Sequence, residues 1–325
     1  AACERLCARG WQVTLIERHA QPATEASGNL AGIYMPLLSK DDNIPTRLTR
    51  AAFLFALAYW KKLGRVIEGE QCGVMQLARD ASHAQVQREI AGLWNYPPEF
   101  AQWLEADDAS ALLGSPAPDG AWLFPQGGWA RPGSVCGAML AACGDRLATV
   151  FGAGSVGIEY VDSQWRVTGA DGAAIAAAPV LILANGTGAI ALGQASTLPL
   201  WRVRGQVSYL DEGAVPELPF VLCREAYLTR AAGGIHSAGA TYDLHDHDPQ
   251  LRQSSHDENL SKVRSLLGDA GLVPDAPLRG RVGFRCVGPD RLPLVGALPD
   301  ATPTGRAERL RDLPRHPGLY GLLGY

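Results

Sequence analysis

The sequence predicts an α/β fold in which a nucleotide-binding domain with a parallel sheet is interleaved with a second domain built on a mixed sheet. Residues 1–17 have the pattern of a helix, a glycine and a buried strand that ends in an acid. The apolar run 179–186 is typical of a strand buried on both faces. Strand-like segments at 202–210, 220–229 and 236–242 precede a helix at 257–268 and indicate a second, more antiparallel sheet.

Length and composition exclude several classes of protein. The 325 residues suffice for about two domains, and 47% hydrophobic with 19% charged residues is typical of a folded globular chain. The net charge of -4 gives no overall cationic field, so a nucleic acid would have to bind a local basic patch. No apolar run reaches the roughly 20 residues that cross a bilayer, and the seven scattered cysteines show no zinc-ligand spacing. We therefore expect a cytoplasmic protein with reduced thiols and no membrane contact.

The first 17 residues carry a nucleotide-binding signal. Ala1–Arg9 contains helix formers, Gly10 takes the place of a helix-ending glycine, and Trp11–Glu17 is largely apolar up to its final acid. In a nucleotide-binding βαβ unit such an acid follows the glycine-rich turn by about 20 residues and accepts hydrogen bonds from a ribose hydroxyl. We therefore expect that turn to precede Ala1. The apolar end at 318–325 likewise indicates a unit that is interrupted.

The middle of the chain alternates loops, helices and strands. The loop Ala26–Pro36 is dense in small residues, which let the backbone approach a ligand closely. A helix is predicted over 44–63, with its buried stripe at Leu48, Ala52, Phe55, Leu57 and Tyr59. The remaining predicted elements are a strand at 73–79, helices at 81–93, 98–114 and 132–143, and strands at 149–160 and 165–168.

Arginines interrupt two apolar, strand-like stretches, Arg202–Ser208 and Gly283–Gly296. Burial of a guanidinium is costly unless an anion or a carboxylate pairs with it. Arg285 is therefore a candidate for binding a ligand carboxylate in a cleft, and the alternative is an internal ion pair, for instance with Asp290.

The sequence argues against a metal centre and against hydrolase chemistry. His245 and His247 lie in the acidic segment 243–248, but two imidazoles spaced by two residues, without a distant further ligand, are better interpreted as a solvated loop. Gly-x-Ser-x-Gly, His-Glu-x-x-His and phosphate-binding lysine motifs do not occur.

Several segments resemble the FAD-dependent amine oxidoreductases of the D-amino-acid oxidase, glycine oxidase and sarcosine oxidase superfamily. More narrowly, they look like the oxidoreductase half of the bifunctional tRNA 5-methylaminomethyl-2-thiouridine biosynthesis (MnmC) family; they are Ala26–Pro36 with Leu38–Asn43, Phe124–Trp129, Cys223–Thr229 and Gly239–Tyr242. The resemblance implies a D-amino-acid oxidase-like architecture. Its Rossmann-like FAD-binding domain would comprise 1–68, 125–198 and 283–325, and its mixed-sheet α+β substrate domain would comprise 69–124 and 199–282.

The resemblance also implies an activity and partners. The family oxidises the glycine-like C–N group of 5-carboxymethylaminomethyl(-2-thio)uridine at the wobble position of tRNA, which releases glyoxylate and leaves 5-aminomethyl(-2-thio)uridine. FAD would be the cofactor, and a SAM-dependent methyltransferase domain, fused or separate, would lie upstream. Basic residues that could face the tRNA are Lys40, Lys61, Lys62, Arg65, Arg202 and Arg204.

By resemblance, Glu17 would hold the adenosine ribose with Arg18 beside it, and Arg285 matches the carboxylate-binding arginine of the superfamily. The flavin would be lined by Ser27, Gly28, Asn29, Ala31 and Gly32, the adenine by Val156, the diphosphate by Asn185 and Gly186, and the substrate also by Gln206, Tyr227 and Tyr242. No obligatory side-chain acid or base is expected, because the flavin carries the redox chemistry. A further glycine-arginine flavin segment is expected after Tyr325.

Two other functions stay open at this point. An FAD-dependent oxidase or dehydrogenase of free glycine, sarcosine or D-amino acids would share the scaffold. A non-catalytic, flavin-free remnant would keep the fold and act as a binding module for tRNA or a protein.

Overall fold

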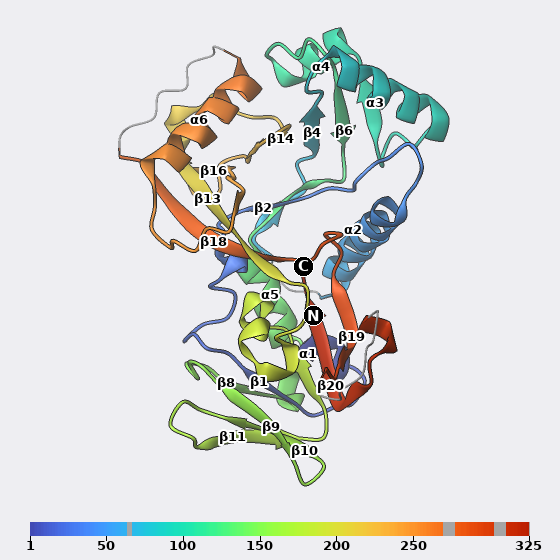
Figure 1. The fold of residues 1–325 in the computed structure, drawn as a ribbon. Coiled ribbons are helices and arrows are strands. Elements are labelled where there is room, and N and C mark those ends of the chain that lie inside the picture. The colour runs from blue at the N-terminus through green and yellow to red at the C-terminus, as the bar shows by residue number, and fades with distance from the viewer. Residues whose placement is uncertain (64–66, 269–276, 302–309, 325) are drawn as a thin grey trace.

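The computed structural model describes residues 1–63, 67–268, 277–301 and 310–324. Figure 1 shows helices α3, α4 and α6 around the upper end of the molecule and the small sheet β9–β11 at its lower end. Among the described residues, the helices are too short or too polar to cross a bilayer. All seven cysteines are free thiols.

The predicted helix, glycine, strand and acid are confirmed at the N-terminus. Helix α1 spans Ala2–Cys7, and strand β1 spans Val13–Ile16 and pairs in parallel with β8, Leu147–Val150. Gly10 between them has a φ of 90°, in the left-handed region that favours glycine. This turn reverses the chain, so that β1 ends with Glu17 at its carboxyl end.

Two further small sheets complete the lower part of the molecule. Strands β9 (Gly157–Val161), β10 (Gln164–Thr168) and β11 (Ala174–Ala178) form an antiparallel meander. Strand β12 (Leu181–Leu183) pairs in parallel with β20 (Arg315–Leu323), which pairs antiparallel with β19 (Leu294–Pro299). Buried residues of these strands, including Trp165, Leu183, Leu298 and Leu319, share one apolar cluster.

Two strand predictions in this region are wrong. The segment 149–160 is not one strand, because β8 ends at Val150 and Gly152 and Gly154 then take positive φ values of 72° and 64°. The sequence also predicts a central buried strand over 179–186. Its regular part, β12, instead lies at the edge of its three-stranded sheet and is half-buried.

The upper part of the molecule is built on one nine-stranded sheet that two distant segments share. Its order is β17 (Asp243–Leu244), β13 (Trp201–Asp211), β16 (Ile235–Gly239), β15 (Tyr227–Leu228), β14 (Val221–Cys223), β4 (Val74–Leu77), β6 (Ala121–Phe124) and β5 (Gln102–Leu104), with β18 (Arg279–Val287) paired to β13. Parallel pairing of β14 with β4 joins the two segments. The predicted strand 220–229 is therefore two short strands that form a hairpin.

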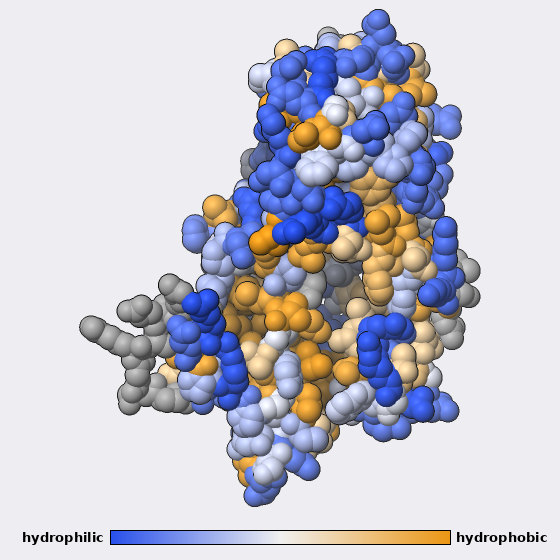
Figure 2. All heavy atoms as spheres, turned by 90° about the vertical axis from the view of Figure 1, so that its right-hand side faces the viewer, coloured by the Kyte–Doolittle hydropathy of each residue, from blue (hydrophilic) through white to orange (hydrophobic). Residues whose placement is uncertain are grey.

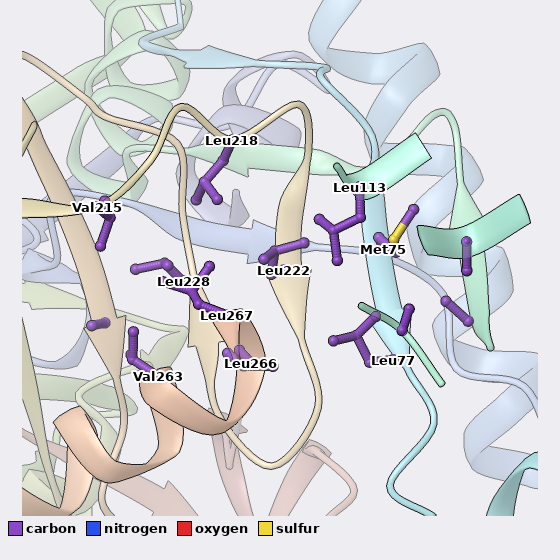
Figure 3. Close-up of a cluster of buried hydrophobic side chains, with 14 of the residues drawn as sticks. Met75, Leu77, Leu113, Val215, Leu218, Leu222, Leu228, Val263, Leu266 and Leu267 are labelled. Carbon is purple, nitrogen blue, oxygen red and sulfur yellow. The ribbon is translucent and has the colours of Figure 1, made fainter. Parts of the chain in front are cut away.

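Alternation along these strands separates two cores. Met75 and Leu222 face α4 (Ala106–Leu113) and α6 (Gln253–Leu267), in the cluster that Figure 3 shows. Their neighbours Val74 and Val221 face the opposite side, where α2 (Ile44–Leu63), α3 (Ala81–Trp94) and the sheet of β2 (Gly32–Tyr34), β7 (Gly128–Ala130) and β3 (Gly69–Glu70) contribute residues. At this end, the sheet is covered on both faces.

Helix boundaries largely agree with the sequence, but the buried face of α2 agrees only in part. Helices are confirmed at 44–63 and 81–94, and at α5 (Pro132–Ala141) with proline in its first turn. On α2, Tyr59 of the predicted stripe is buried and Leu57 is half-buried, but Leu48 and Phe55 are 42% and 60% exposed, and Phe53, outside the predicted stripe, is buried. The helix is apolar on nearly every side, so its pattern did not fix which side packs. Figure 2 shows apolar atoms gathered around a hollow in the middle of the face to which α2 belongs.

The predicted helix 98–114 is also corrected. Gln102–Leu104 forms β5 and pairs with β6, and the helix α4 begins at Ala106. Gly114 ends it with a φ of 73°.

A buried polar network fastens β13 to α6. Arg204 is fully buried, with Nη1 3.2 Å from Asp243 Oδ2 and Nη2 donating to the carbonyl of Gln250. Further along the same face of the strand, Ser208 Oγ lies 2.8 Å from His256 Nδ1. The network satisfies these polar groups inside the protein and fixes the face of β13 that points toward the helix.

We expect Leu222→Ala to lower the free energy of unfolding by about 2–5 kcal/mol, because Leu222 is fully buried between α4 and α6 and its truncation leaves a cavity. Urea denaturation measures the loss. The matched control is Leu112→Ala on α4, where the side chain is 47% exposed and the change should be within about 0.5 kcal/mol. Equal losses in the two variants would contradict this packing.

The pH dependence of stability should report His256. Burial lowers the pKa of His256, so the unfolded chain binds its proton more readily than the folded chain does. The free energy of unfolding should therefore fall as the pH drops below about 6.5. We expect His256→Asn to flatten this fall between pH 7 and pH 5, whatever its effect at neutral pH. Parallel curves for the two proteins would show that His256 is not responsible.

Candidate functional site

At the β13–β18 end, the nine-stranded sheet has one face free of α6. Residues that oppose one another in antiparallel strands lie on the same face, and here Gly205 opposes Gly283, while Val207 opposes both Gly239 and Arg281. We call Gly205, Gly239 and Gly283 the glycine floor. Because glycines lack side chains, no side chain of these three residues stands above the sheet between Arg281 and Arg285. These two arginines lie at the two ends of this face.

Arg285 lies over the glycine floor. A Cβ at Gly205 would overlap Arg285 Nη1 and lie 3.0 Å from its Cζ. Nη1 donates to the carbonyl of Thr241 at 3.3 Å, and Cζ is 5.6 Å from the centre of the Tyr242 ring. Among the described residues no carboxylate forms an ion pair with Arg285, and the Asp290 carboxylate accepts instead from the Leu292 N–H. The guanidinium can therefore bind an external anion.

Tyr227 adds a neutral hydrogen-bond donor on this face. It opposes Gly239 across the β15–β16 pair. Burial raises the pKa of Tyr227 to about 12, although the positive charge of Arg285 acts in the opposite direction. The phenol thus keeps its proton at neutral pH and can donate to an anion that Arg285 binds.

The segment predicted to line a flavin lies against the glycine floor. The 3-10 turn η1 (Ala26–Gly28) contacts β18, with Ala26 Cα 3.7 Å from the position that a Cβ at Gly283 would take. Arg281 Nη2 donates to the carbonyls of Thr24, at 2.7 Å, and Glu25. A Cβ at Gly28 would lie 2.5 Å from the Arg281 guanidinium, so a side chain here would displace that guanidinium.

The other residues that were predicted to line the flavin lead from η1 into β2. Ser27 is exposed, Asn29 is half-buried and Ala31 is fully buried. Gly32 begins β2. A Cβ at Gly32 would lie 3.3 Å from the Pro132 ring at the start of α5.

Glu17, the predicted ribose-binding acid, lies at the carboxyl end of β1. It follows β1, is half-buried, and its Oε1 accepts the N–H of His19 at 2.9 Å. The carbonyls of residues 17–19 accept the N–H groups of residues 152–154, which brings the loop that leads to Val156 beside Glu17. Arg18 is exposed and its Nη1 lies 3.6 Å from Glu25 Oε1.

Asn185 and Gly186 reach the other end of β18. Asn185 precedes the 3-10 helix η3 (Gly186–Ala191), and Gly186 takes a φ of 55°. A Cβ at Gly186 would lie 3.8 Å from Cys286 Cβ, next to Arg285 in the sequence. One strand therefore links the predicted diphosphate, flavin and carboxylate residues.

Three buried donors near η1 and β7 were missed by the sequence reasoning. Arg281 Nε, Arg131 Nε and Trp129 Nε1 have no hydrogen-bond partner in the described structure. Buried donors normally find acceptors, so these three fit a bound group rich in oxygen and ring nitrogen acceptors, such as a flavin dinucleotide. Arg281 occupies the same face of the same strand as Arg285, which is the signal that could have found it.

Two predicted residues do not reach this face. The Gln206 side chain is fully buried toward α6, where its Oε1 accepts from Arg204 and from the Arg252 N–H and its Nε2 donates to the Arg252 carbonyl. Arg204, predicted to face tRNA, is fully buried in the same network. Alternation along β13 explains both corrections, because the even-numbered positions point toward the helix.

The remaining basic candidates are dispersed. Lys40 pairs with Glu89 at 2.8 Å, Lys61 and Lys62 are exposed on α2, and Arg202 Cζ lies 4.7 Å from the Phe284 ring centre. Arg65 lies outside the described residues. The described candidates lie on different elements, so they do not form one patch around Arg285.

The acidic side chains of the histidine-containing segment 243–248 form ion pairs with arginines of the same chain. Asp246 and Asp248 both form ion pairs with Arg252, and Asp243 pairs with Arg204. Within the described ranges no cluster of three or more His, Cys, Asp or Glu could hold a metal ion.

Comparison with known proteins identifies the family. The model of the DAO family, described as FAD dependent oxidoreductase, matches residues 2–325. The chain belongs to this family. FAD is therefore the cofactor of this oxidoreductase, as the sequence predicted, and the unpartnered donors around η1 suit it.

Curated relatives of this FAD-dependent oxidoreductase include two bifunctional proteins named tRNA 5-methylaminomethyl-2-thiouridine biosynthesis bifunctional protein MnmC. The protein from Burkholderia thailandensis is 43% identical over 337 residues, and that from Burkholderia pseudomallei is 42% identical. The alignments cover 100% of this chain but 52% and 51% of the relatives. The chain thus spans about half the length of these curated relatives.

Solved structures of the same fold include two oxidases. Glycine oxidase from Geobacillus kaustophilus has a TM-score of 0.78 at 20% identity, over 99% of this chain and 85% of that chain. Iminodiacetate oxidase from Chelativorans has a TM-score of 0.74 at 21% identity, over 99% and 86%. At these identities the likeness establishes the D-amino-acid oxidase-like fold.

We expect Gly205→Ala to raise KM for a carboxylate substrate about tenfold or more, because the new methyl group displaces the Arg285 guanidinium and weakens a charge-assisted hydrogen bond. Steady-state kinetics of the flavin-loaded enzyme measure this. Gly213→Ala is the control, since a Cβ there meets nothing within 4 Å. An unchanged KM in Gly205→Ala would place the carboxylate elsewhere.

Proposed function

We propose that this chain oxidises the glycine-like C–N group of 5-carboxymethylaminomethyl(-2-thio)uridine in tRNA, releasing glyoxylate and leaving 5-aminomethyl(-2-thio)uridine. The observation that carries the proposal is Arg285, a guanidinium without a carboxylate partner among the described residues, which lies over the glycine floor that η1 also contacts. Whole-chain identity of 43% to a protein named for this tRNA modification supports the choice of substrate.

The proposed chemistry needs little from side chains beyond positioning. The substrate CH2–NH unit loses two electrons and two protons to become C=N, water adds to the carbon, and the C–N bond breaks to give glyoxylate and the primary amine. FAD, when bound, accepts the two electrons. Arg285 binds the glycine-like carboxylate, and the neutral Tyr227 phenol donates to it. The glycine floor leaves room for the methylene between the carboxylate and the ring.

We assign the cofactor contacts in the same way. Glu17 accepts from the ribose hydroxyls, and the backbone at Val156 meets the adenine. The backbone of 27–32 would line the flavin, and the partnerless donors of Arg281 and Arg131 would be available to its acceptors. Asn185 and Gly186 lie toward the diphosphate.

We also infer how the chain divides into two domains and which further domain acts with it. The FAD-binding part would comprise 1–68, 125–198 and 283–325, and the substrate part 69–124 and 199–282. Because the relatives are bifunctional and about twice as long, a SAM-dependent methyltransferase domain would complete the modification of the same nucleoside. Work on tRNA would place the protein in the cytoplasm.

The test is a mass-spectrometric assay on tRNA that carries the 5-carboxymethylaminomethyl nucleoside, with full-length, flavin-loaded protein. We expect this nucleoside to disappear, 5-aminomethyl(-2-thio)uridine to form, and glyoxylate to be released in equal amount. Unchanged tRNA together with turnover of free glycine, sarcosine or D-amino acids would instead support the free amino acid oxidase. Absence of a flavin spectrum in the intact protein would support the non-catalytic remnant.

A further inference from the structure

Arg291 is a second cation at the mouth of the site, and the chemistry described so far does not use it. It lies in the turn between β18 and β19, and its Cζ is 5.6 Å from the centre of the Tyr242 ring, the same distance as that of Arg285. The two guanidinium carbons are therefore no more than twice 5.6 Å apart. Tyr242 itself is 44% exposed.

The turn directs Arg291 toward this ring. Its N–H donates to the carbonyl of Gly288 at 3.2 Å, and the next N–H, of Leu292, donates to Asp290 Oδ1 at 3.0 Å. Asp290 thus serves the turn, and within the described structure Arg291 forms no ion pair with any carboxylate. Arg291 is exposed, so its charge is open to solvent.

Two adjacent cations without carboxylates suit a ligand with two adjacent anions. Free glycine or sarcosine offers one carboxylate, which Arg285 satisfies. A nucleotide with a carboxylate on the substituent at pyrimidine C5 offers two anions close together, because the C5 edge of the base faces the 5′ phosphate of the same nucleotide. Phosphate groups are commonly bound by arginine in RNA complexes, and exposed tyrosines stack on unpaired bases.

We propose that Arg291 binds a backbone phosphate of the RNA substrate while Arg285 binds the carboxylate, both beside the Tyr242 ring that the two guanidiniums contact. This inference rests on the proposed function and deepens it. The pair of arginines would select a nucleotide in RNA over a free amino acid, and Arg291 would be the residue that distinguishes the two.

The experiment compares two substrates of the full-length, flavin-loaded protein. One is an anticodon stem–loop RNA that contains 5-carboxymethylaminomethyluridine, and the other is the same modified nucleoside without phosphates. We expect Arg291→Ala to lower kcat/KM for the RNA about tenfold more than for the nucleoside, and Arg291→Lys to restore part of the difference. The control is Arg166→Ala on β10, a surface arginine paired with Glu159, which should not change the ratio.

RNA binding gives a second readout that does not need catalysis. The slope of log K against log salt concentration should decrease in magnitude by about 0.7 in Arg291→Ala, as for the loss of one phosphate contact to single-stranded nucleic acid. An equal effect on RNA and nucleoside, or an unchanged salt slope, would overturn the role of Arg291. Failure of the wild-type protein to convert either substrate would contradict the proposed function instead, while the salt slope would still test Arg291.

Discussion

The structure depends on the antiparallel pairing of β13 with β18. This register places Gly205 opposite Gly283 and thereby fixes Arg285 over a surface without side chains. It also fixes the opposite face, because the period of a strand is two residues and a slip by one would exchange the two faces. The buried contacts of Arg204, Gln206 and Ser208 with α6 and the loop that leads to it fix which face of β13 points toward the helix.

Residues far apart in the sequence meet at this strand pair. The segment after β1 reaches β18 through η1, the end of β12 reaches it through η3, and the hairpin β14–β15 presents Tyr227 to the same face. An FAD-dependent oxidoreductase can therefore collect its cofactor and substrate contacts along one strand. Rigid strands position such groups more accurately than loops do.

Local patterns predicted the parts of the fold that local chemistry determines. The glycine after α1 and the acid after β1 follow from chain reversal and strand polarity, and Arg285 stood out because a guanidinium in an apolar strand needs an anion. The buried face of α2 could not be predicted, because Phe53 and Phe55 are equally apolar and tertiary contacts decide between them. Gln206 and Arg204 were misplaced for a related reason: alternation shows that a strand has two faces but not which face meets the ligand. Arg281 shares a face of β18 with Arg285 and could have been found from that alternation, whereas the place of Arg131 near η1 depends on contacts between distant segments, which no short motif records.

The most direct measurement is a crystal structure of the full-length, flavin-loaded protein with glycolate, a carboxylate that the enzyme cannot oxidise as an amine. We expect the glycolate carboxylate to bond to Arg285 above Gly205 and the flavin ring to lie along residues 27–32. A carboxylate bound away from Arg285, or Arg285 paired with a protein carboxylate in that structure, would contradict it.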